Sequence, residues 1–313
     1  MSVISISPIS VAEFEKFQQL IYQHAGISLA PEKKVMVASR LAKRLNHYGL
    51  PNYGQYYQLA TNPDYPNEFQ MLVNILTTNE TYFFREPKHF DFFRDEILKP
   101  HRGERFRVWS AASSTGEEAH SLAMVMADTL GMRKWEIFGS DLSTRVLDIA
   151  KNGVYPMERL EHMPATFLEK YALKGVRSQE GYFRVIEKLR DRMHFDQANL
   201  MKPLVPSIGK FDVIFLDPFI HTSNASLLSI QIFRKLYDLL KYDGVLVCSA
   251  SSKSTKIALS KSTFKFYDFA VPNSDIKGLW AIKGKNDLIG SFYDDPYLVY
   301  RDKQILVNYE KNK

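Results

Sequence analysis

Apolar residues in the first quarter of the chain recur at the spacing of α-helices. Phe14, Phe17 and Ile21 fall on one face of a first expected helix. A second helix is expected over about 31–47, and its apolar stripe is made of Val35, Ala38, Leu41, Ala42 and Leu45. Two shorter helices follow. This periodicity predicts a small all-helical domain over residues 1–76.

Beyond this helical part, short apolar runs alternate with helical patterns. The runs expected to form strands are 106–109, 135–140, 211–216 and 244–248. Helices are expected from about Gly116 and over 227–240. Such alternation predicts a parallel, doubly wound sheet, and hence an α/β domain over 77–313. The tail, 253–313, contains further strand-like segments, which we expect to finish the sheet as an antiparallel hairpin and edge; a separate binding module is the alternative.

Composition narrows the class of protein. The 313 residues are 45% hydrophobic and 24% charged, as in ordinary globular proteins. A single cysteine, Cys248, excludes an internal disulfide, and no Cys/His spacing indicates zinc. The first residues lack the pattern of a signal peptide, and no uncharged apolar run reaches the roughly 18 residues of a membrane span. We therefore expect a cytoplasmic protein without membrane insertion.

The formal net charge of +6 is unevenly distributed. On the second expected helix, Lys33, Arg40 and Arg44 share a face, with Lys43 beside them. A solvated helix face is one interpretation of this basic surface, and a docking surface for an acidic partner is the other. No basic motif interleaved with aromatic residues accompanies the charge, so no nucleic-acid partner is expected.

Candidate chemistry begins after the first expected strand. No side chain from Ser110 to Gly116 is larger than threonine, which lets backbone amides approach a ligand, and Glu117 and Glu118 then begin a helix. Either these acids only favour the helix dipole, or one of them receives an ammonium group. Asp141 follows the second strand, where an acid can accept hydrogen bonds from ribose hydroxyls; a helix cap is the alternative role.

Three segments together are far more specific than any one of these features. They read TTNETYFFRE from Thr77, RVWSAASSTGEEAHSLAM from Arg107 and FGSDLSTRVLDIAKNGVY from Phe138. In these segments the chain resembles the CheR family of chemotaxis receptor methyltransferases, over about residues 11–250. The resemblance implies a Rossmann-like sheet that binds S-adenosylmethionine, a small β insertion near 170–195, and methyl transfer to receptor glutamates that leaves S-adenosylhomocysteine.

The resemblance also implies roles for individual residues. The methionine end and the reacting centre would be enclosed by Asn79, Thr81 and Arg85, with Arg85 able to neutralise a carboxylate; capping of the next helix is their alternative role. Glu117 would hold the ammonium group and Asp141 the ribose. Asn199 and Leu200 match the adenine-contacting pair of the family. The partner would be the acidic helices of receptors, docked on Lys33, Arg40, Lys43 and Arg44. We expect neither a general base nor a metal.

The chain departs from the family pattern at two strand ends. Where the family has Cys-Arg-Asn, this chain has Leu216, Asp217 and Pro218, so a cation becomes an anion and an amide is lost. The later Gly-His-Ser-Glu of the family is replaced over 249–252. These changes predict activity that is lower than that of the relatives, or absent. The alternative is a degenerate module that binds the cofactor or a receptor as a regulator; a nucleic-acid methyltransferase fits worse, because base-methylating signatures are absent.

Overall fold

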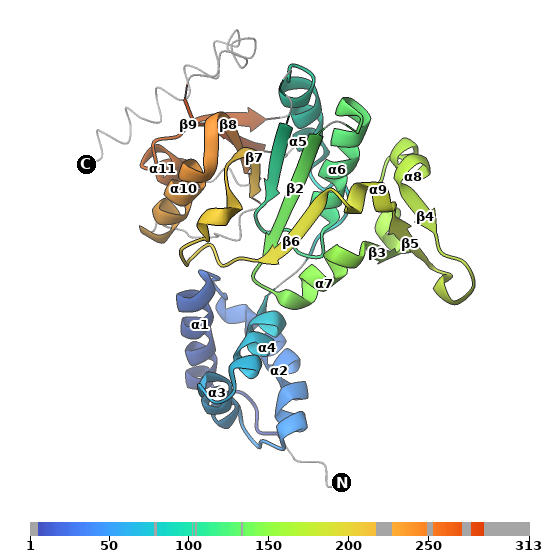
Figure 1. Cartoon of the computed structure of the whole chain (residues 1–313). Helices are drawn as coiled ribbons and strands as arrows, with labels where there is room; N and C mark the ends of the chain where they lie inside the picture. The colour runs from blue at the N-terminus through green and yellow to red at the C-terminus, as the bar shows by residue number, and fades with distance from the viewer. Residues whose placement is uncertain are drawn as a thin grey trace.

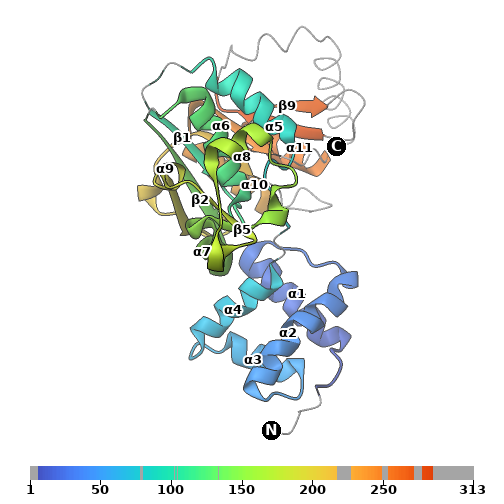
Figure 2. The ribbon, with the colours of Figure 1, turned by 90° about the vertical axis from the view of Figure 1, so that its right-hand side faces the viewer.

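A computed structural model describes residues 6–77, 80–101, 103, 105–132, 134–216, 227–248, 253–270 and 277–284 of the chain. It contains a helical unit and, beyond Thr77, a larger α/β unit (Figures 1 and 2). Asn79, Asp217, Pro218, residues 249–252 and residues 285–313 lie outside the described residues, so the structure does not bear on the expectations placed there.

The helical unit is built from α1 (Val11–Ala25), α2 (Lys34–Tyr48), α3 (Tyr53–Thr61) and α4 (Pro66–Leu76), with the 3-10 turn η1 (Pro31–Lys33) before α2. Local sequence fixes the ends of α1. Ser10 and Glu13 form a reciprocal capping box at its start, and Gly26 ends it in the left-handed conformation at φ 71°. The helices enclose a core of their own, whose largest fully buried side chains are Tyr56, Phe17, Ile21, Leu41 and Leu45.

The buried stripe of α2 differs from the expected one at its first position. Val35 is 78% exposed, whereas Val37, Leu41 and Leu45 are fully buried. Residues 37, 41 and 45 are four apart and share one face, while position 35 lies about 200° around the helix from position 37. Val35 therefore does not belong to the buried stripe of α2.

The α/β unit is organised on a seven-stranded sheet in the order β6-β2-β1-β7-β8-β10-β9. Its strands are β1 (Arg105–Ser110), β2 (Lys134–Asp141), β6 (Met193–Gln197), β7 (Phe211–Leu216), β8 (Leu240–Cys248), β9 (Lys265–Ala270) and β10 (Lys277–Ile282). The pairs from β6 to β8 are parallel, and β10 is antiparallel to both β8 and β9. The predicted parallel α/β sheet and its antiparallel completion are thus confirmed for the described strands.

Helices cover the two faces of this sheet (Figure 1). The longer ones are α6 (Glu117–Leu130), α7 (Thr144–Asn152), α10 (Leu227–Leu239) and α11 (Lys253–Ser260), and the shorter ones are α5 (Pro87–Phe92) with the π-helical turn η2 (Phe93–Leu98), α8 (Ala165–Tyr171) and α9 (Glu187–Arg190). One core cluster joins α6 to one face of the sheet, and a second joins α10 and α11 to the other. No helix among the described residues is both long and apolar enough to cross a membrane.

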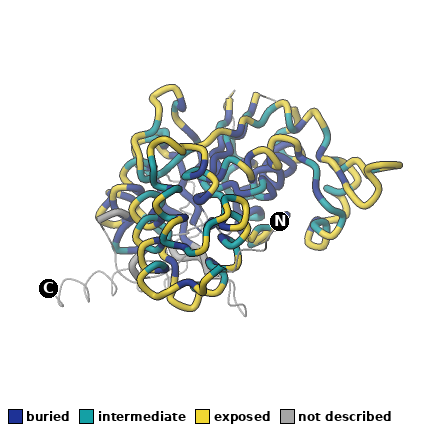
Figure 3. Tube along the Cα trace, turned by 90° about the horizontal axis from the view of Figure 1, so that it is seen from below, coloured by how far each residue is buried: buried dark blue, intermediate teal, exposed yellow. Residues whose placement is uncertain are grey.

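A second sheet projects from the side of the α/β unit. It is antiparallel, in the order β3-β5-β4, and consists of β3 (Val154–Pro156), β4 (Ala172–Lys174) and β5 (Tyr182–Val185). Exposed residues predominate in the projection that carries β4 and β5 (Figure 3). Met193, which lies within the expected bounds of the insertion, is not part of this sheet, because β6 pairs with β2 in the main sheet. The strands of this sheet lie between residues 154 and 185, whereas the insertion was expected near 170–195, because strand alternation alone cannot tell which sheet a segment joins.

The strand order places the ligand edge of the sheet. From β1, the chain first builds outward through β2 and β6, and then returns to add β7 on the other side of β1. Ligands of open α/β sheets bind at such a reversal, beyond the carboxyl ends of the strands. Ser110, Asp141 and Leu216 end β1, β2 and β7 at that edge.

Candidate cofactor and substrate site

The loop between β1 and α6 forms the floor of the site. The amide of Ser113 donates to the carbonyl of Ser140 at 2.8 Å, which holds the loop against β2. Gly116 has φ 94°, and a Cβ there would lie 2.7 Å from the Cβ of Ala150 and 3.0 Å from the hydroxyl oxygen of Tyr155. Only glycine fits this position, so the loop reaches the helix start without a side chain in the way.

Asp141 organises the polar edge of this floor. Its carboxylate accepts hydrogen bonds from the amides of Ser114 and Ser143, both at 2.9 Å, and the residue is 8% exposed. Burial raises the pKa of the Asp141 carboxyl, while these amide donors act in the opposite direction. The hydroxyls of Ser113, Ser114 and Ser143 are buried and have no hydrogen-bond partner in the described structure. A polar ligand at this edge would satisfy groups that the protein leaves unpaired.

Glu117 is the first residue of α6 and is 1% exposed. The hydroxyl of Thr115 donates to its Oε2 at 2.5 Å, and Arg159 Nη1 lies 3.6 Å from its Oε1. Burial raises the pKa of the Glu117 carboxyl, an effect that the Thr115 hydroxyl and Arg159 partly offset. A carboxylate this deeply buried needs a cationic partner, which is the requirement expected of an ammonium-binding group.

The segment 80–86 forms the opposite wall. Phe84 and Glu86, at φ 56° and 55°, place two non-glycine residues in the left-handed conformation on either side of Arg85. The amide of Phe84 donates to the hydroxyl of Ser121, and that hydroxyl donates to the carbonyl of Glu117, which ties the segment to α6. The strained turn therefore holds Arg85 in a set position over the start of α6.

Two neighbouring pockets adjoin the segment 80–86. One, of about 40 Å³, is lined by 13 residues that include Thr81, Arg85, Ser113 and Ser114. The other, of about 500 Å³, is lined by Glu80, Thr81, Tyr82, Arg85, Glu86, Glu158, Arg159, Glu161 and His162. Thr81 and Arg85 line both pockets. The smaller pocket also contains Ser114, whose amide donates to Asp141. The larger pocket also contains Arg159, which pairs with Glu117.

Asn199 and Leu200 line neither of these two pockets. The side-chain nitrogen Nδ2 of Asn199 donates to the carbonyl of His24 at 2.7 Å, and its side-chain oxygen Oδ1 accepts from the backbone amide of Met201 at 2.9 Å. Leu200 packs against the apolar cluster below α10 and α11. Their assignment to adenine stays a prediction, as do the assignments of Thr81, Arg85, Glu117 and Asp141.

The helical unit contacts the same edge of the sheet. Gln70 donates to the carbonyl of Leu142 at 3.2 Å, and Asn74 donates to the hydroxyl of Thr144 at the same distance. Gln197 in turn donates to the side-chain oxygen of Gln70 at 2.8 Å. The residues that follow Asp141 are therefore held by α4 as well as by the sheet.

The four basic residues expected to dock a receptor divide into two pairs. Lys33, in η1 just before α2, and Lys43, in α2, are exposed. Arg40 instead donates to the carbonyls of Ile75 and Thr77, and Arg44 forms an ion pair with the buried Glu68. The two arginines are engaged within the helical unit, so a docking role rests more directly on the two lysines.

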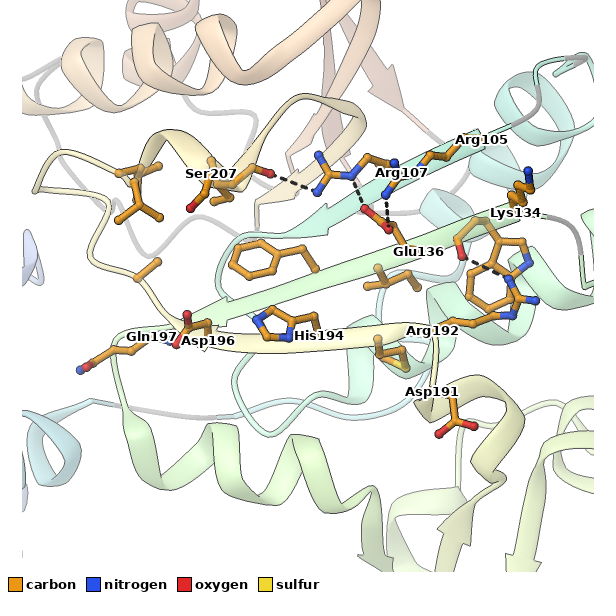
Figure 4. A pocket seen from close by; sticks show the side chains of 18 of the residues that line it. Arg105, Arg107, Lys134, Glu136, Asp191, Arg192, His194, Asp196, Gln197 and Ser207 are labelled. Atoms are coloured by element: carbon orange, nitrogen blue, oxygen red, sulfur yellow. Dashed lines mark hydrogen bonds and ion pairs between the residues drawn. The ribbon is translucent and has the colours of Figure 1, made fainter.

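A larger groove, of about 1430 Å³, opens on the sheet face that carries β1, β2 and β6 (Figure 4). Three of its charged residues pair with one another, since Arg105 donates to Glu136 at 2.8 Å and Arg107 also binds Glu136. Of the described residues assigned to the cofactor, only Asn199 lines it. We interpret this groove as an open sheet face, not as the reaction site.

Family comparison identifies the cofactor of this chain. The family described as "CheR methyltransferase, SAM binding domain" matches residues 79–266, and "CheR methyltransferase, all-alpha domain" matches residues 12–77. This chain belongs to the CheR methyltransferase family. It is therefore a methyltransferase that depends on S-adenosylmethionine, as its sequence motifs predicted.

Curated relatives extend the match over most of the chain. The "Chemotaxis protein methyltransferase" of Escherichia coli (strain K12) is 40% identical over 246 residues, which cover 78% of this chain and 85% of that protein. "Chemotaxis protein methyltransferase 2" of Pseudomonas aeruginosa is 42% identical over 208 residues, covering 65% and 73%. The CheR fold and the cofactor thus rest on long alignments and not on short motifs alone.

The residues present fit this cofactor. S-adenosylmethionine carries an ammonium group, a carboxylate and ribose hydroxyls, and the edge offers a buried carboxylate at Glu117, guanidinium groups at Arg85 and Arg159, and an acidic strand end at Asp141. Arg159 was not among the residues predicted from the sequence. Its only signal is spatial, because it comes from the 3-10 turn η3 (Met157–Leu160) and meets Glu117 across the fold.

Proposed function

We propose that this protein methylates glutamate side chains of chemotaxis receptors. The observation that carries the proposal is the 40% identity to a chemotaxis protein methyltransferase over 78% of the chain. The cofactor supplies an activated methyl group on a sulfonium, so the bond that breaks is S–CH3 and the bond that forms is O–CH3. A glutamate carboxylate, with an ordinary pKa of about 4.3, is already ionised at neutral pH and needs no base.

The task left to the protein is to position the substrate carboxylate and to exclude water from it. In the proposal, Arg85 guides the carboxylate, because its guanidinium lines both pockets and is held by a bond from Nη1 to the carbonyl of Glu80 at 2.8 Å. The proposed cofactor contacts are Asn79, Thr81 and Arg85 at the methionine end, Glu117 at the ammonium group, Asp141 at the ribose, and Asn199 with Leu200 at the adenine.

Transfer of a tritiated methyl group to receptor-bearing membranes tests this function. The expected product is a base-labile methyl ester, with more label from the Asp217→Arg/Pro218→Asn variant than from the natural chain, because a carboxylate substrate is repelled by an anion placed near it. Base-stable label would refute a carboxyl ester. Cofactor binding without transfer by either form would instead favour the regulatory module.

We further propose that the exposed face of α2 docks an acidic receptor helix. Charge reversal of Lys33 and Lys43 to glutamate is expected to slow association with a receptor fragment and to flatten its dependence on salt, because both lysines are exposed. Surface plasmon resonance at several salt concentrations measures this. Glu substitution of both Lys174 and Lys188, exposed lysines on β4 and α9, is the control with the same change of net charge. An unchanged rate and salt slope in the Lys33 and Lys43 variant would leave α2 as a solvated face.

A further inference from the structure

Arg159 joins three parts of the cofactor site. Its Nη1 lies 3.6 Å from Oε1 of Glu117 and also donates to the carbonyl of Thr81 in the opposite wall. The turn that carries it follows β3, where the hydroxyl of Tyr155 donates to the carbonyl of Thr115 at 2.7 Å. Arg159 is thus positioned by the fold beside the buried acid and is not a surface residue that happens to lie nearby.

Arg159 and Glu117 are close enough to attract each other electrostatically, but they do not form a hydrogen bond. A separation of 3.6 Å exceeds the usual length of a hydrogen bond, while Oε2 of Glu117 is already held by Thr115 at 2.5 Å. Both contacts of Arg159 use the same nitrogen, so its Nε and Nη2 make no hydrogen bond with the described residues. Its side chain is 39% exposed and lines the pocket of about 500 Å³, whereas that of Glu117 is 1% exposed.

We infer that Glu117 and Arg159 together bind the zwitterionic amino-acid end of the cofactor, Glu117 through the ammonium group and Arg159 through the α-carboxylate. The inference rests on the proposed role of Glu117. In an α-amino acid one carbon separates the two charged groups, so the group that binds the carboxylate must lie next to the group that binds the ammonium. Arg159 is the cation paired with Glu117 among the described residues.

Charge balance supports this arrangement. The ion pair and the zwitterionic amino-acid end are each neutral, so this end of the cofactor adds no net charge beside the buried acid, and the four charges can alternate in sign. The planar guanidinium also suits a carboxylate, which it can bind through two parallel hydrogen bonds. Glu117 alone would accept any primary amine, and Arg159 restricts the site to an amine that carries a neighbouring carboxylate.

A comparison of two cofactor forms tests the inference directly. S-adenosylmethionine and its decarboxylated form, in which a propylamine replaces the amino-acid end, differ only in the α-carboxylate. Calorimetric titration of the full chain without receptor gives affinities for both, for the natural protein and for the Arg159→Gln, Arg159→Lys and Glu117→Gln variants. Arg145→Gln, which removes an exposed arginine of α7, is the control for net charge.

The expected result is a selective loss. Arg159→Gln should weaken binding of S-adenosylmethionine roughly 10- to 100-fold, the usual range for a hydrogen bond to a charged group, and that of the decarboxylated form less than about threefold. Arg159→Lys should recover part of the loss, Glu117→Gln should weaken both ligands, and Arg145→Gln neither. Thermal unfolding confirms that each variant is folded.

Two outcomes would overturn the inference. Equal losses for both ligands in Arg159→Gln would mean that Arg159 supports the site without touching the carboxylate. Unchanged cofactor affinity with a raised KM for the receptor would assign Arg159 to the substrate glutamate. Failure of the natural protein to bind either ligand would instead contradict cofactor binding at this site, and with it the proposed function, so the two failures are distinguishable.

Discussion

Replacement of Glu68 by alanine is expected to destabilise the helical unit by about 3–5 kcal/mol, the cost of leaving a buried charge without its partner. Glu68, on α4, is 4% exposed and accepts hydrogen bonds from Arg44 at 2.8 Å, Tyr48 at 2.9 Å and Tyr56 at 2.8 Å. These donors come from α2 and α3, so a single carboxylate connects three of the four helices. Loss of the Glu68 carboxylate leaves the Arg44 guanidinium and the hydroxyls of both tyrosines without this hydrogen-bond acceptor.

The same cluster predicts how stability depends on pH. Burial alone would raise the pKa of Glu68, but hydrogen bonds from Arg44, Tyr56 and Tyr48 outweigh it and hold the pKa below its usual value. A carboxyl with a lowered folded-state pKa contributes stability above the unfolded pKa of about 4.3, and this contribution is lost as the pH falls below it. The destabilisation caused by Glu68→Ala should therefore shrink on acidification.

Urea unfolding followed by two signals can assign the effect to the helical unit. All three tryptophans, Trp109, Trp135 and Trp280, belong to the α/β unit, so their fluorescence reports on that unit while circular dichroism reports on both. Glu68→Ala should move the dichroism transition far more than the fluorescence transition. Glu15→Ala, at an exposed position of α1, should move neither by more than about 0.5 kcal/mol. Equal stability of the Glu68 and Glu15 variants would contradict the prediction.

Replacement of Asp141 by alanine is expected to weaken binding of S-adenosylhomocysteine at least about 100-fold, or roughly 2.7 kcal/mol. The carboxylate is proposed to bind the ribose, and it also holds the amides of Ser114 and Ser143 at 2.9 Å. Each buried amide left without an acceptor costs about 1–3 kcal/mol, so the loop loses its shape together with a ligand contact.

Isothermal titration calorimetry measures the loss, and a second substitution checks its origin. Asp148→Ala removes an exposed acid from α7, four residues beyond the first residue of that helix, and should leave affinity unchanged. Because Asp141 also joins two loops, its replacement should lower the unfolding temperature as well. Full affinity of the Asp141→Ala variant for S-adenosylhomocysteine would show that the Asp141 carboxylate does not contribute to cofactor binding.

Sequence patterns predicted the elements and their order, because strand alternation and helix periodicity are local properties. The departures arise where the deciding contact is distant in sequence. Lys43 and Arg44 are adjacent in sequence, but Lys43 is exposed whereas Arg44 is half-buried. The difference arises because Arg44 pairs with the buried Glu68 on another helix. Likewise, Met193 begins β6, and its pairing with β2, which is distant in sequence, determines the sheet that it joins.

In the candidate site, too, some residues could be predicted from local sequence, whereas others depend on contacts that are distant in sequence. Glu117 and Asp141 could be proposed from sequence, since each follows a strand and begins or precedes a helix. Arg159 could not, because nothing in its own neighbourhood distinguishes it from the other arginines of the chain, and its significance comes from Glu117 and Thr81 across the fold. The left-handed conformations at Phe84 and Glu86 were equally invisible, since neither residue type favours them.

Hydrogen bonds from Gln70 to the carbonyl of Leu142 and from Asn74 to the hydroxyl of Thr144 connect the helical unit to the residues that follow Asp141. These bonds set the distance between the proposed docking face of α2 and the proposed site of methyl transfer. A receptor helix advances about 1.5 Å and turns about 100° with each residue, so a glutamate moved by one position misses the methyl group in both depth and direction. Among many glutamates on a receptor, the enzyme would then select by position along the helix more than by neighbouring sequence.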